Sequence, residues 1–238
     1  MPSKQHYKRI LLKLSGEMLA GEHKFGIDPQ FTYKLCKKIK GISDLGLEIG
    51  IVIGGGNIFR GISASAKGMD RVAGDYLGMM ATIMNSVALQ SELEKMNCDT
   101  RVMSALSITQ LAEPYIRRRA NRHLEKGRIV IMAGGTGNPY FTTDTAAVLR
   151  AVEICADVVI KGTKVDGIYS KDPLLHSDAV KYDKLSYKEV IDKELRVMDL
   201  TAITLCKEND LPIVVFDINT KRGLIDLINS KSIGTLVN

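Results

Sequence analysis

The sequence lacks the signatures of several common ligand sites. Its 238 residues contain no Gly-Lys dipeptide, which a Walker A loop requires, and no Gly-x-Gly-x-x-Gly dinucleotide fingerprint. The four cysteines have no Cys-x-x-Cys spacing, and the four histidines form no spaced cluster. A P-loop kinase, a standard Rossmann dehydrogenase, a zinc site and a disulfide framework are therefore disfavoured, and we expect a protein of the reducing cytoplasm.

Long hydrophobic runs are missing as well. The most apolar long stretch, residues 72–89, carries Gly74, Asp75 and Gly78, and the apolar run near the N-terminus is interrupted by Lys13. No small-residue cleavage pattern follows that run. We therefore expect neither a transmembrane helix nor a targeting segment.

The charge balance is modestly basic. Lys and Arg number 33 against 27 Asp and Glu, a formal net charge of +6, so nucleic acid and a small, highly anionic ligand are both candidate partners. The composition, 45% hydrophobic and 25% charged, is that of an ordinary globular protein. At this length we expect a single domain over residues 1–238, without room for a separate regulatory domain.

Short apolar runs alternate with helical patterns along the chain. This alternation predicts an α/β fold, a three-layer αβα sandwich around a mostly parallel central sheet. The runs are apolar nearly throughout, as expected for strands that are covered on both faces. We predict strands at 9–14, 48–53, 100–105, 128–133, 158–161, 213–216 and 235–237, and helices at 29–45, 72–96, 108–126, 145–155, 187–193 and 200–209.

Three glycine-containing segments follow predicted strands, at 13–16, 54–57 and 134–138. Glycine lets backbone N–H groups approach an anion closely, and the helix N-termini beyond such turns favour phosphate. Each segment alone is equally a tight turn between a strand and a helix. Because the ends of parallel strands meet at one edge, three such turns together predict a phosphate-handling crevice.

Charged candidates lie close to these turns. Lys13 stands inside an apolar strand, which is costly unless its ammonium reaches an anion at the strand end, and Arg60 and Lys161 are further nearby cations. Asp144 begins a helix, so helix capping competes with a role in the site. For other aspartates a structural role is the alternative: dipole complementation for Asp75, an N-cap for Asp199, and turns for Asp166 and Asp172.

Six motifs resemble those of bacterial UMP kinases, a branch of the amino acid kinase superfamily. The match runs in order from Arg9 to the C-terminal GTLV, and GTGNPYFTTD distinguishes this branch from acetylglutamate and carbamate kinases. Tyr140 stands where phenylalanine is common. The motifs are KRILLKLSGE at 8–17, FGID at 25–28, IVIGGGNIFRG at 51–61, GDYLGMMATIMN at 74–85, GTGNPYFTTDTAA at 135–147 and KGTKVDGIYSKDP at 161–173.

The resemblance implies transfer of the ATP γ-phosphoryl group to UMP, with Mg²⁺, in pyrimidine nucleotide biosynthesis. It also implies a homohexamer, activation by GTP and inhibition by UTP, with Arg101 and Arg128 as basic effector positions. Residues 150–238 would bind mainly ATP, and the N-terminal part would bind UMP and make subunit contacts. The implied ATP-binding residues are Lys13, Leu14, Ser15, Gly16, Gly56, Arg60, Thr163, Tyr169 and Asp172. The implied UMP-binding residues are Gly55, Asp75, Thr136, Gly137, Asn138, Pro139, Tyr140, Phe141, Thr142 and Thr143.

Such a reaction needs no general base, because the acceptor is a phosphate oxygen that is already deprotonated. Catalysis is then positioning and charge stabilisation, for which we expect Lys13, Arg60 and Lys161. We expect Asp144 to organise Lys13 or the magnesium shell rather than to accept a proton. Two alternatives remain open. The basic residues between Arg117 and Arg128 suggest nucleic-acid binding, although no aromatic interleaving accompanies them and we consider it the weaker reading, and a related amino acid or carbamate kinase would share two of the glycine loops.

Overall fold

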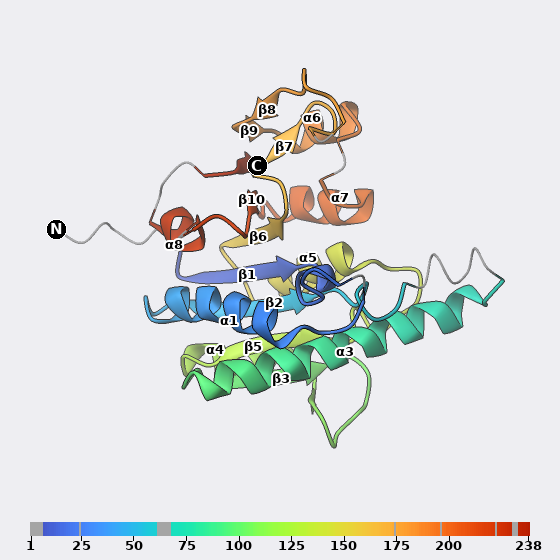
Figure 1. The fold of residues 1–238 in the computed structure, drawn as a ribbon, viewed down its shortest axis with the longest axis vertical. Helices are drawn as coiled ribbons and strands as arrows, with labels where there is room; N and C mark the ends of the chain where they lie inside the picture. Colours follow the sequence, from blue (N-terminus) through green and yellow to red (C-terminus); the bar gives the residue numbers. More distant parts are fainter. Residues whose placement is uncertain are drawn as a thin grey trace.

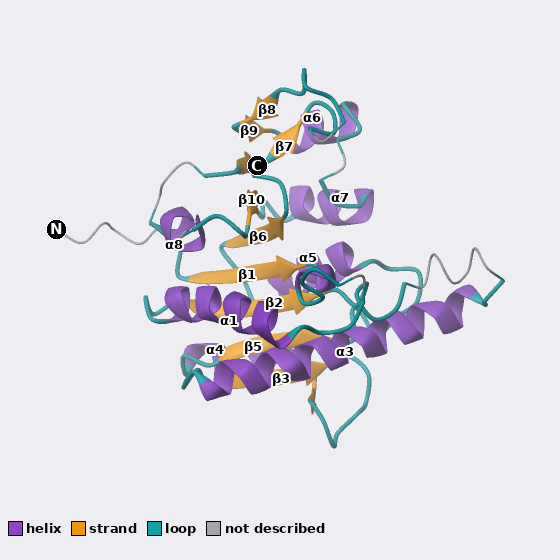
Figure 2. Ribbon diagram, viewed as in Figure 1, coloured by secondary structure: helices purple, strands orange, loops and turns teal. Residues whose placement is uncertain are grey.

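A nine-stranded sheet forms the centre of the protein (Figures 1 and 2). The computed structural model describes residues 7–23, 25–60, 68–173, 175–195, 197–221, 223–229 and 233–238. All pairs in the sheet are parallel except β10 with β11. The strand order is β4 (Glu113–Pro114), β3 (Thr100–Ser104), β5 (Ile129–Ala133), β2 (Glu48–Ile53), β1 (Arg9–Leu14), β6 (Val158–Thr163), β10 (Ile213–Asp217), β11 (Thr235–Val237) and β9 (Lys184–Leu185).

Helices cover both faces of this sheet and make the three layers that the sequence predicts. Successive residues of β1 point to opposite faces: Ile10, Leu12 and Leu14 pack in one core cluster and Leu11 in the other. The first cluster includes side chains of α1 (Pro29–Ser43), α3 (Arg71–Lys95) and α8 (Gly223–Ile228). The second includes side chains of α4 (Arg117–Glu125), α5 (Thr143–Glu153), α6 (Tyr187–Asp192) and α7 (Leu200–Glu208).

The prediction of one helix over 108–126 is wrong. Residues 105–112 form a loop, Glu113 and Pro114 pair with β3, and α4 begins only at Arg117. Proline disfavours helical backbone in the residue before it and lacks an N–H group, so Pro114 is compatible with an edge strand but not with a continuous helix.

Several short elements lie outside the sequence prediction. A two-stranded antiparallel sheet joins β7 (Ile168–Tyr169) and β8 (Lys181–Tyr182), and a single 3₁₀ turn, η1 (Gly16–Met18), follows β1. Strand β9 and helix α8 were also not predicted. Two-residue strands and single turns carry too few residues for a hydrophobic period to show.

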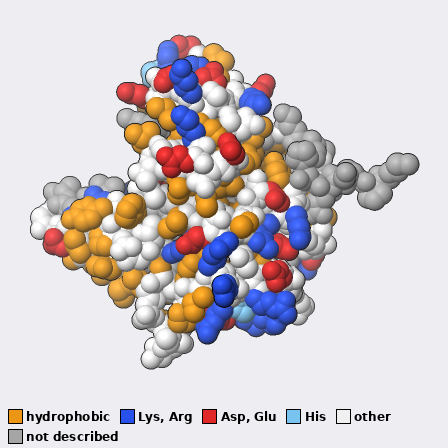
Figure 3. All heavy atoms as spheres, turned by 180° about the vertical axis from the view of Figure 1, so that it is seen from behind, with side chains coloured by type: hydrophobic (Ala, Val, Ile, Leu, Met, Phe, Trp, Pro, Cys, Tyr) orange, Lys and Arg blue, Asp and Glu red, His pale blue; other side chains and the backbone are white. Residues whose placement is uncertain are grey.

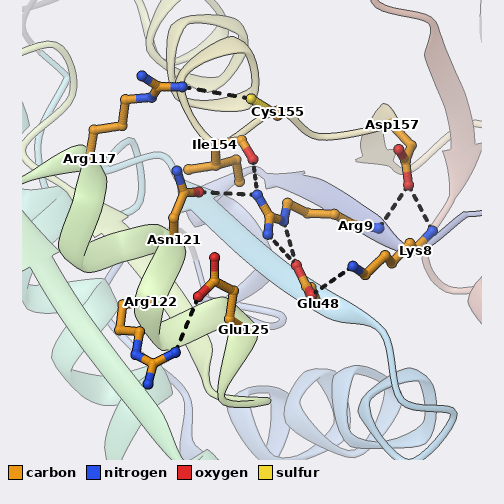
Figure 4. A network of polar contacts seen from close by, with 10 residues as sticks. All are labelled: Lys8, Arg9, Glu48, Arg117, Asn121, Arg122, Glu125, Ile154, Cys155 and Asp157. Atoms are coloured by element: carbon orange, nitrogen blue, oxygen red, sulfur yellow. Dashed lines mark hydrogen bonds and ion pairs between the residues drawn. The ribbon is translucent and has the colours of Figure 1, made fainter.

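A polar network closes the edge of the sheet at which β1 and β2 begin (Figure 4). The Arg9 guanidinium donates to Glu48 Oε2 at 2.5 Å, to Asn121 Oδ1 at 3.1 Å and to the Ile154 carbonyl. The Asp157 carboxylate accepts from the backbone N–H groups of residues 8 and 9 at 2.7 and 2.8 Å. These contacts tie β1 and β2 to α4 and to the end of α5, at the edge opposite the glycine turns.

Hydrophobic side chains are exposed along α3. Tyr76, Leu77, Met80 and Met84 are 38–55% exposed, and Figure 3 shows hydrophobic side chains gathered on the part of the molecule that projects to the left. In the described part of the chain, no helix is both long and apolar enough to cross a membrane.

Candidate functional site

The three glycine turns meet at one edge of the sheet, as expected from the parallel order β5-β2-β1. Gly54 N–H donates to the Leu14 carbonyl at 3.0 Å, which joins the first two turns. A Cβ atom at Gly16 would strike the Gly54 carbonyl and Asn57 Oδ1, and one at Gly55 would lie 2.7 Å from both Ala81 Cβ and the Gly78 carbonyl oxygen. Glycine is therefore required at both positions, because the backbones of the turns and of α3 approach so closely.

Two lysines stand side by side at this edge. Lys13 of β1 and Lys161 of β6 are register partners on neighbouring parallel strands, so their side chains leave the sheet on the same face. Asp144 of α5 lies between them: Oδ1 is 2.7 Å from Lys13 Nζ, and Oδ2 is 3.0 Å from Lys161 Nζ. Lys161 Nζ also donates to the Val197 carbonyl. The three charged side chains are only 11–17% exposed.

This burial and pairing shift two pKa values. Burial alone would raise the pKa of Asp144, but the ammonium groups of Lys13 and then Lys161 outweigh it and hold that pKa below its usual value. Burial, followed by repulsion from Lys13, lowers the pKa of Lys161 despite the attraction of Asp144. Asp144 is thus a buried carboxylate that stays ionised, and a poor proton acceptor.

Helix capping does not explain Asp144. The N-cap of α5 is Thr142, whose Oγ1 accepts from the N–H groups of Asp144 and Thr145 at 3.0 and 3.3 Å. The Asp144 side chain is therefore free to hold the two lysines.

Arg60 lies at the rim of the glycine turns and is not part of the lysine pair. Its Nε donates to the Gly56 carbonyl at 3.1 Å, and its Nη2 contacts Glu17 Oε1. Its side chain is 56% exposed, so it borders the crevice from solvent.

A pocket of about 600 Å³ opens on the β6 side of the lysine pair. Its lining includes Lys161. It also includes Thr163, Tyr169 and Asp172, the three residues of this region that the resemblance assigns to ATP. Tyr169 Oη donates to Asp166 Oδ1 at 2.6 Å, and Lys181 pairs with the other oxygen of Asp166 at 2.9 Å. The β7–β8 hairpin is thereby braced beside the pocket.

A second pocket, of about 220 Å³, lies between the turns after β2 and β5 and the first half of α3. Most of the residues that the resemblance assigns to UMP line this pocket: Gly55, Asp75, Thr136, Asn138, Phe141, Thr142 and Thr143. Gly56 lines it as well. Gly137, Pro139 and Tyr140 belong to the same turn but do not line the pocket. Leu14, which the resemblance assigns to ATP, has a fully buried side chain in the core and can offer only its backbone to a ligand.

Asp75 holds the turn after β5 against α3. Its carboxylate pairs with Arg71 Nε at 2.8 Å, and Oδ2 accepts from the Tyr140 N–H at 2.8 Å. Tyr140 has φ of 71°, a left-handed conformation that is uncommon for a residue with a side chain. The main partners of the Asp75 carboxylate are therefore the Arg71 guanidinium and the Tyr140 N–H, rather than the dipole at the N-terminus of α3.

Asp199 is the N-cap that the sequence predicts, since Oδ1 accepts from the Ala202 N–H at 2.9 Å. It does more than cap. The same carboxylate accepts from Thr145 Oγ1 at 2.9 and 3.0 Å and from Thr142 Oγ1, so α7 is joined to the start of α5 beside Asp144.

A buried pair of amides was not predicted. Asn57 and Asn85 donate to each other's oxygen at 3.0 and 2.7 Å, and their remaining N–H groups donate to the carbonyls of Gly26 and Gly54 at 2.8 Å each. Both side chains are fully satisfied and at most 1% exposed. The sequence signal for this contact was Asn85, a polar residue within the apolar stretch of α3, whose amide supports the turn after β2.

Arg101 and Arg128 lie apart from both pockets, around Glu113 and His123. Arg128 Nη1 is 3.0 Å from His123 Nδ1, His123 Nε2 is 3.2 Å from Glu113 Oε2, and Arg101 Nε is 3.9 Å from Glu113 Oε1. In the basic helix beside them, Arg117 Nε donates to the Glu153 carbonyl at 2.6 Å and Arg122 pairs with Glu125 at 3.4 Å, so part of its charge has intramolecular partners.

Among the described residues, no group of three or more His, Cys, Asp or Glu side chains could hold a metal ion. The carboxylate closest to the lysine pair, Asp144, already has an ammonium group on each oxygen.

Comparison with known proteins gives a consistent result. The chain is similar to a UMP kinase from Bacillus anthracis, with 40% identity over 98% of this chain and 96% of that one and a TM-score of 0.95. It is also similar to a UMP kinase from Ureaplasma parvum (35% identity, 97% and 98% covered, TM-score 0.91) and to a uridylate kinase from Archaeoglobus fulgidus (28%, 96% and 99%, 0.74). The sequence model of the amino acid kinase family matches residues 8–217, and this chain belongs to the amino acid kinase family.

Proposed function

We propose that this protein is a UMP kinase, which transfers the γ-phosphoryl group of ATP to UMP and yields UDP and ADP in pyrimidine nucleotide biosynthesis. The observation that carries the proposal is the buried Lys13–Asp144–Lys161 centre at the shared edge of a larger and a smaller pocket. Near-full-length similarity to UMP kinases supports it.

The 600 Å³ pocket is the proposed ATP side. Thr163, Tyr169 and Asp172 would hold the adenosine half, while Lys13, Ser15, Gly16, Gly56 and Arg60 would follow the phosphates, with Leu14 offering only its backbone. These residues lie at the ends of β1, β2 and β6, which are parallel neighbours in the sheet, or in the segments that follow them, with Tyr169 in β7. The ATP side thus draws on both the N-terminal turns and the C-terminal part of the chain.

The smaller pocket is the proposed UMP side. Gly55 and Asp75 would contact UMP, and Thr136, Asn138, Phe141, Thr142 and Thr143 would line the nucleotide. Gly137, Pro139 and Tyr140 would act through the shape of the turn rather than by lining the pocket. Backbone amides of glycine turns suit a phosphate that must approach closely.

The reaction needs charge stabilisation more than proton transfer. Two polyanions must meet, and the acceptor phosphate oxygen is already deprotonated, so no general base is required. Lys13 and Lys161 would neutralise charge on the transferred group, and Asp144 would keep both ammonium groups in place until the phosphates arrive. Arg60, more exposed, would close over the phosphates from the rim.

Magnesium is the expected companion of ATP. The cations at this edge suit the nucleotide phosphates on which the ion would arrive. When bound there, it would neutralise phosphate charge.

Assembly and regulation are further parts of the proposal. The exposed apolar side chains of α3 suit burial between subunits of a homohexamer. Arg101 and Arg128, linked through Glu113 and His123, would form a basic site for GTP as activator, with UTP as inhibitor. The four unpaired cysteines suit a reducing cytoplasm.

An acceptor panel tests the function. ADP production would be followed with ATP and Mg²⁺ and either UMP, CMP, dUMP, N-acetylglutamate or carbamate, each with and without GTP and UTP. We expect ADP formation that depends on UMP. Activity on an amino acid or on carbamate with UMP ignored would contradict the proposal, as would submicromolar DNA affinity at physiological salt without any kinase activity.

A further inference from the structure

Arg150, in the last turn of α5, is a buried arginine that the proposed mechanism does not use. It is 6% exposed, and arginine is almost never buried to this degree unless it is paired. Its guanidinium has three partners. Nη1 is 2.7 Å from Glu153 Oε2, Nη2 donates to the Gly135 carbonyl at 3.2 Å, and Cζ lies 4.0 Å from the centre of the Tyr115 ring.

The partner that matters for the site is the Gly135 carbonyl. Gly135 belongs to the turn after β5, in which Gly134, Gly135 and Gly137 all have positive φ, of 76°, 60° and 85°. Such a backbone has many alternatives in solution, so its native shape depends on contacts from outside. Thr82 Oγ1 accepts from the Gly134 N–H at 2.9 Å and Asp75 accepts from the Tyr140 N–H, while inside the turn the Gly137 N–H donates to the Gly134 carbonyl at 3.0 Å. Arg150 holds the Gly135 carbonyl from outside the turn.

The peptide between Gly135 and Thr136 connects this contact to the pocket. A trans peptide is planar, and its C=O and N–H point in opposite directions. Because the Gly135 carbonyl accepts from the Arg150 guanidinium, the Thr136 N–H points away from that guanidinium. Thr136 lines the smaller pocket, and within the described residues its N–H has no hydrogen-bond acceptor. Arg150 thus fixes the orientation of a peptide in the wall of this pocket.

The chemistry of arginine suits this task better than charge alone does. Glu153 balances the charge of the guanidinium, so Arg150 is not a free cation waiting for substrate. The planar fork can hold two acceptors at once while its face packs on an aromatic ring, and a lysine cannot do both. The Tyr115 ring fixes the plane of the fork from the other side.

We propose that Arg150 is a positioning residue for the acceptor, which fixes the Gly135–Thr136 peptide in the wall of the pocket that receives the nucleoside monophosphate. The proposal rests on the proposed function, in which this pocket receives UMP. It assigns to Arg150 an effect on UMP and none on ATP, because its contacts reach only the turn of the smaller pocket.

The test compares Arg150→Met/Glu153→Gln with Glu153→Gln alone. The double variant removes the fork without leaving a buried carboxylate unpaired, and the single variant keeps the donor to Gly135. For the double variant we expect KM for UMP, and the calorimetric Kd for UMP, to rise roughly ten- to a hundredfold, the effect of one lost hydrogen bond to a charged group. KM for ATP should stay within about twofold, and Glu153→Gln should leave KM for UMP within about threefold.

Wild-type KM for UMP in a folded double variant would overturn the proposal, and so would equal increases in both KM values. If the double variant does not fold, Arg150→Lys carries the test. The ammonium of a lysine should pair with the Glu153 carboxylate, the stronger acceptor, and leave the Gly135 carbonyl without its donor. KM for UMP should then rise by at least about threefold with KM for ATP unchanged, and a wild-type value would again refute the role. Failure of the wild-type protein to bind or phosphorylate UMP would instead refute the proposed function.

Discussion

Replacing Asp144 by asparagine should destabilise the protein, and ATP should restore part of the loss. The substitution keeps the shape of the side chain but leaves Lys13 and Lys161 beside each other without an anion. At 2.7 and 3.0 Å, each ion pair has a gross attraction of about 6 kcal/mol at an effective dielectric constant of about 20. Desolvation cancels much of this, and loss of one partner of a buried pair costs about 3–5 kcal/mol.

The three side chains retain 11–17% exposure, so we expect a value at the lower end, about 3 kcal/mol. For a domain of this size that corresponds to a fall in Tm of roughly 6–12 °C. Thermal unfolding followed by circular dichroism, at equal protein concentrations, measures it. A non-hydrolysable ATP analogue with Mg²⁺ should raise the Tm of Asp144→Asn by more than that of the wild type, because its phosphates bring negative charge to the same ammonium groups.

Asp44→Asn is the matched control. It breaks an ion pair of similar length, 2.8 Å to Lys40, but the two side chains are 58% and 37% exposed, so solvent screens the pair and the loss of stability should be small. A Tm of Asp144→Asn within about 2 °C of the wild type would refute the account of Asp144 as the counter-ion of both lysines. Equal stabilisation of wild type and variant by the analogue would refute the claim that phosphates take over its role.

Four further predictions concern the reaction itself. Lys13→Ala should lower kcat about 10²–10³-fold with a modest change in UMP binding, and an unchanged kcat in steady-state assays would remove Lys13 from the centre. Asp75→Asn should raise KM for UMP far more than KM for ATP, whereas equal effects would contradict its place in the smaller pocket. The lowered pKa of Lys161 in the free protein predicts that kcat/KM for ATP falls with rising pH before an ordinary lysine would lose its proton, and Lys161→Arg should move this fall to higher pH. Gly16→Ala should abolish ATP binding in calorimetry, because its Cβ would strike the Gly54 carbonyl; near-native affinity would show that the turn can open.

The pH dependence of stability follows from Asp144. Its pKa is lowered in the folded protein, so its stabilising contribution is complete above the ordinary aspartate pKa and is lost as pH falls through the folded value. Asp144→Asn should lack this part of the acid destabilisation.

The sequence predicts the layers and the crevice well because both depend on local signals. Strands such as β2 and β5 are apolar throughout, and a glycine turn follows each of them, so fold class and the meeting of the turns follow from pattern and from the geometry of parallel sheets. The same uniform hydrophobicity hides the register. Nothing in β1 or β6 indicates that Lys13 and Lys161 are register partners, and so the second ion pair of Asp144, with Lys161, becomes visible only in three dimensions.

The remaining differences have similar physical causes. The helix expected over 108–126 forms only from Arg117, because Pro114 disfavours helical backbone and pairs with the edge of the sheet. The periodicity of hydrophobic residues does not reveal such a pairing with a distant strand. Arg150 and the Asn57–Asn85 pair donate to backbone carbonyls of residues that are distant in the sequence. Such contacts produce no regular spacing of residue types from which they could be predicted. Asp199 shows the limit of local rules: its N-cap role was predictable, but its bonds to Thr142 and Thr145 were not.

The most direct test of the central claim is ³¹P nuclear magnetic resonance of ATP, UMP and Mg²⁺ with the wild-type protein and with Lys13→Ala. The account predicts that the wild type converts ATP and UMP into equal amounts of ADP and UDP, and that the variant does so at least about a hundredfold more slowly. Release of inorganic phosphate with UMP intact, or equal rates in the two proteins, would contradict it.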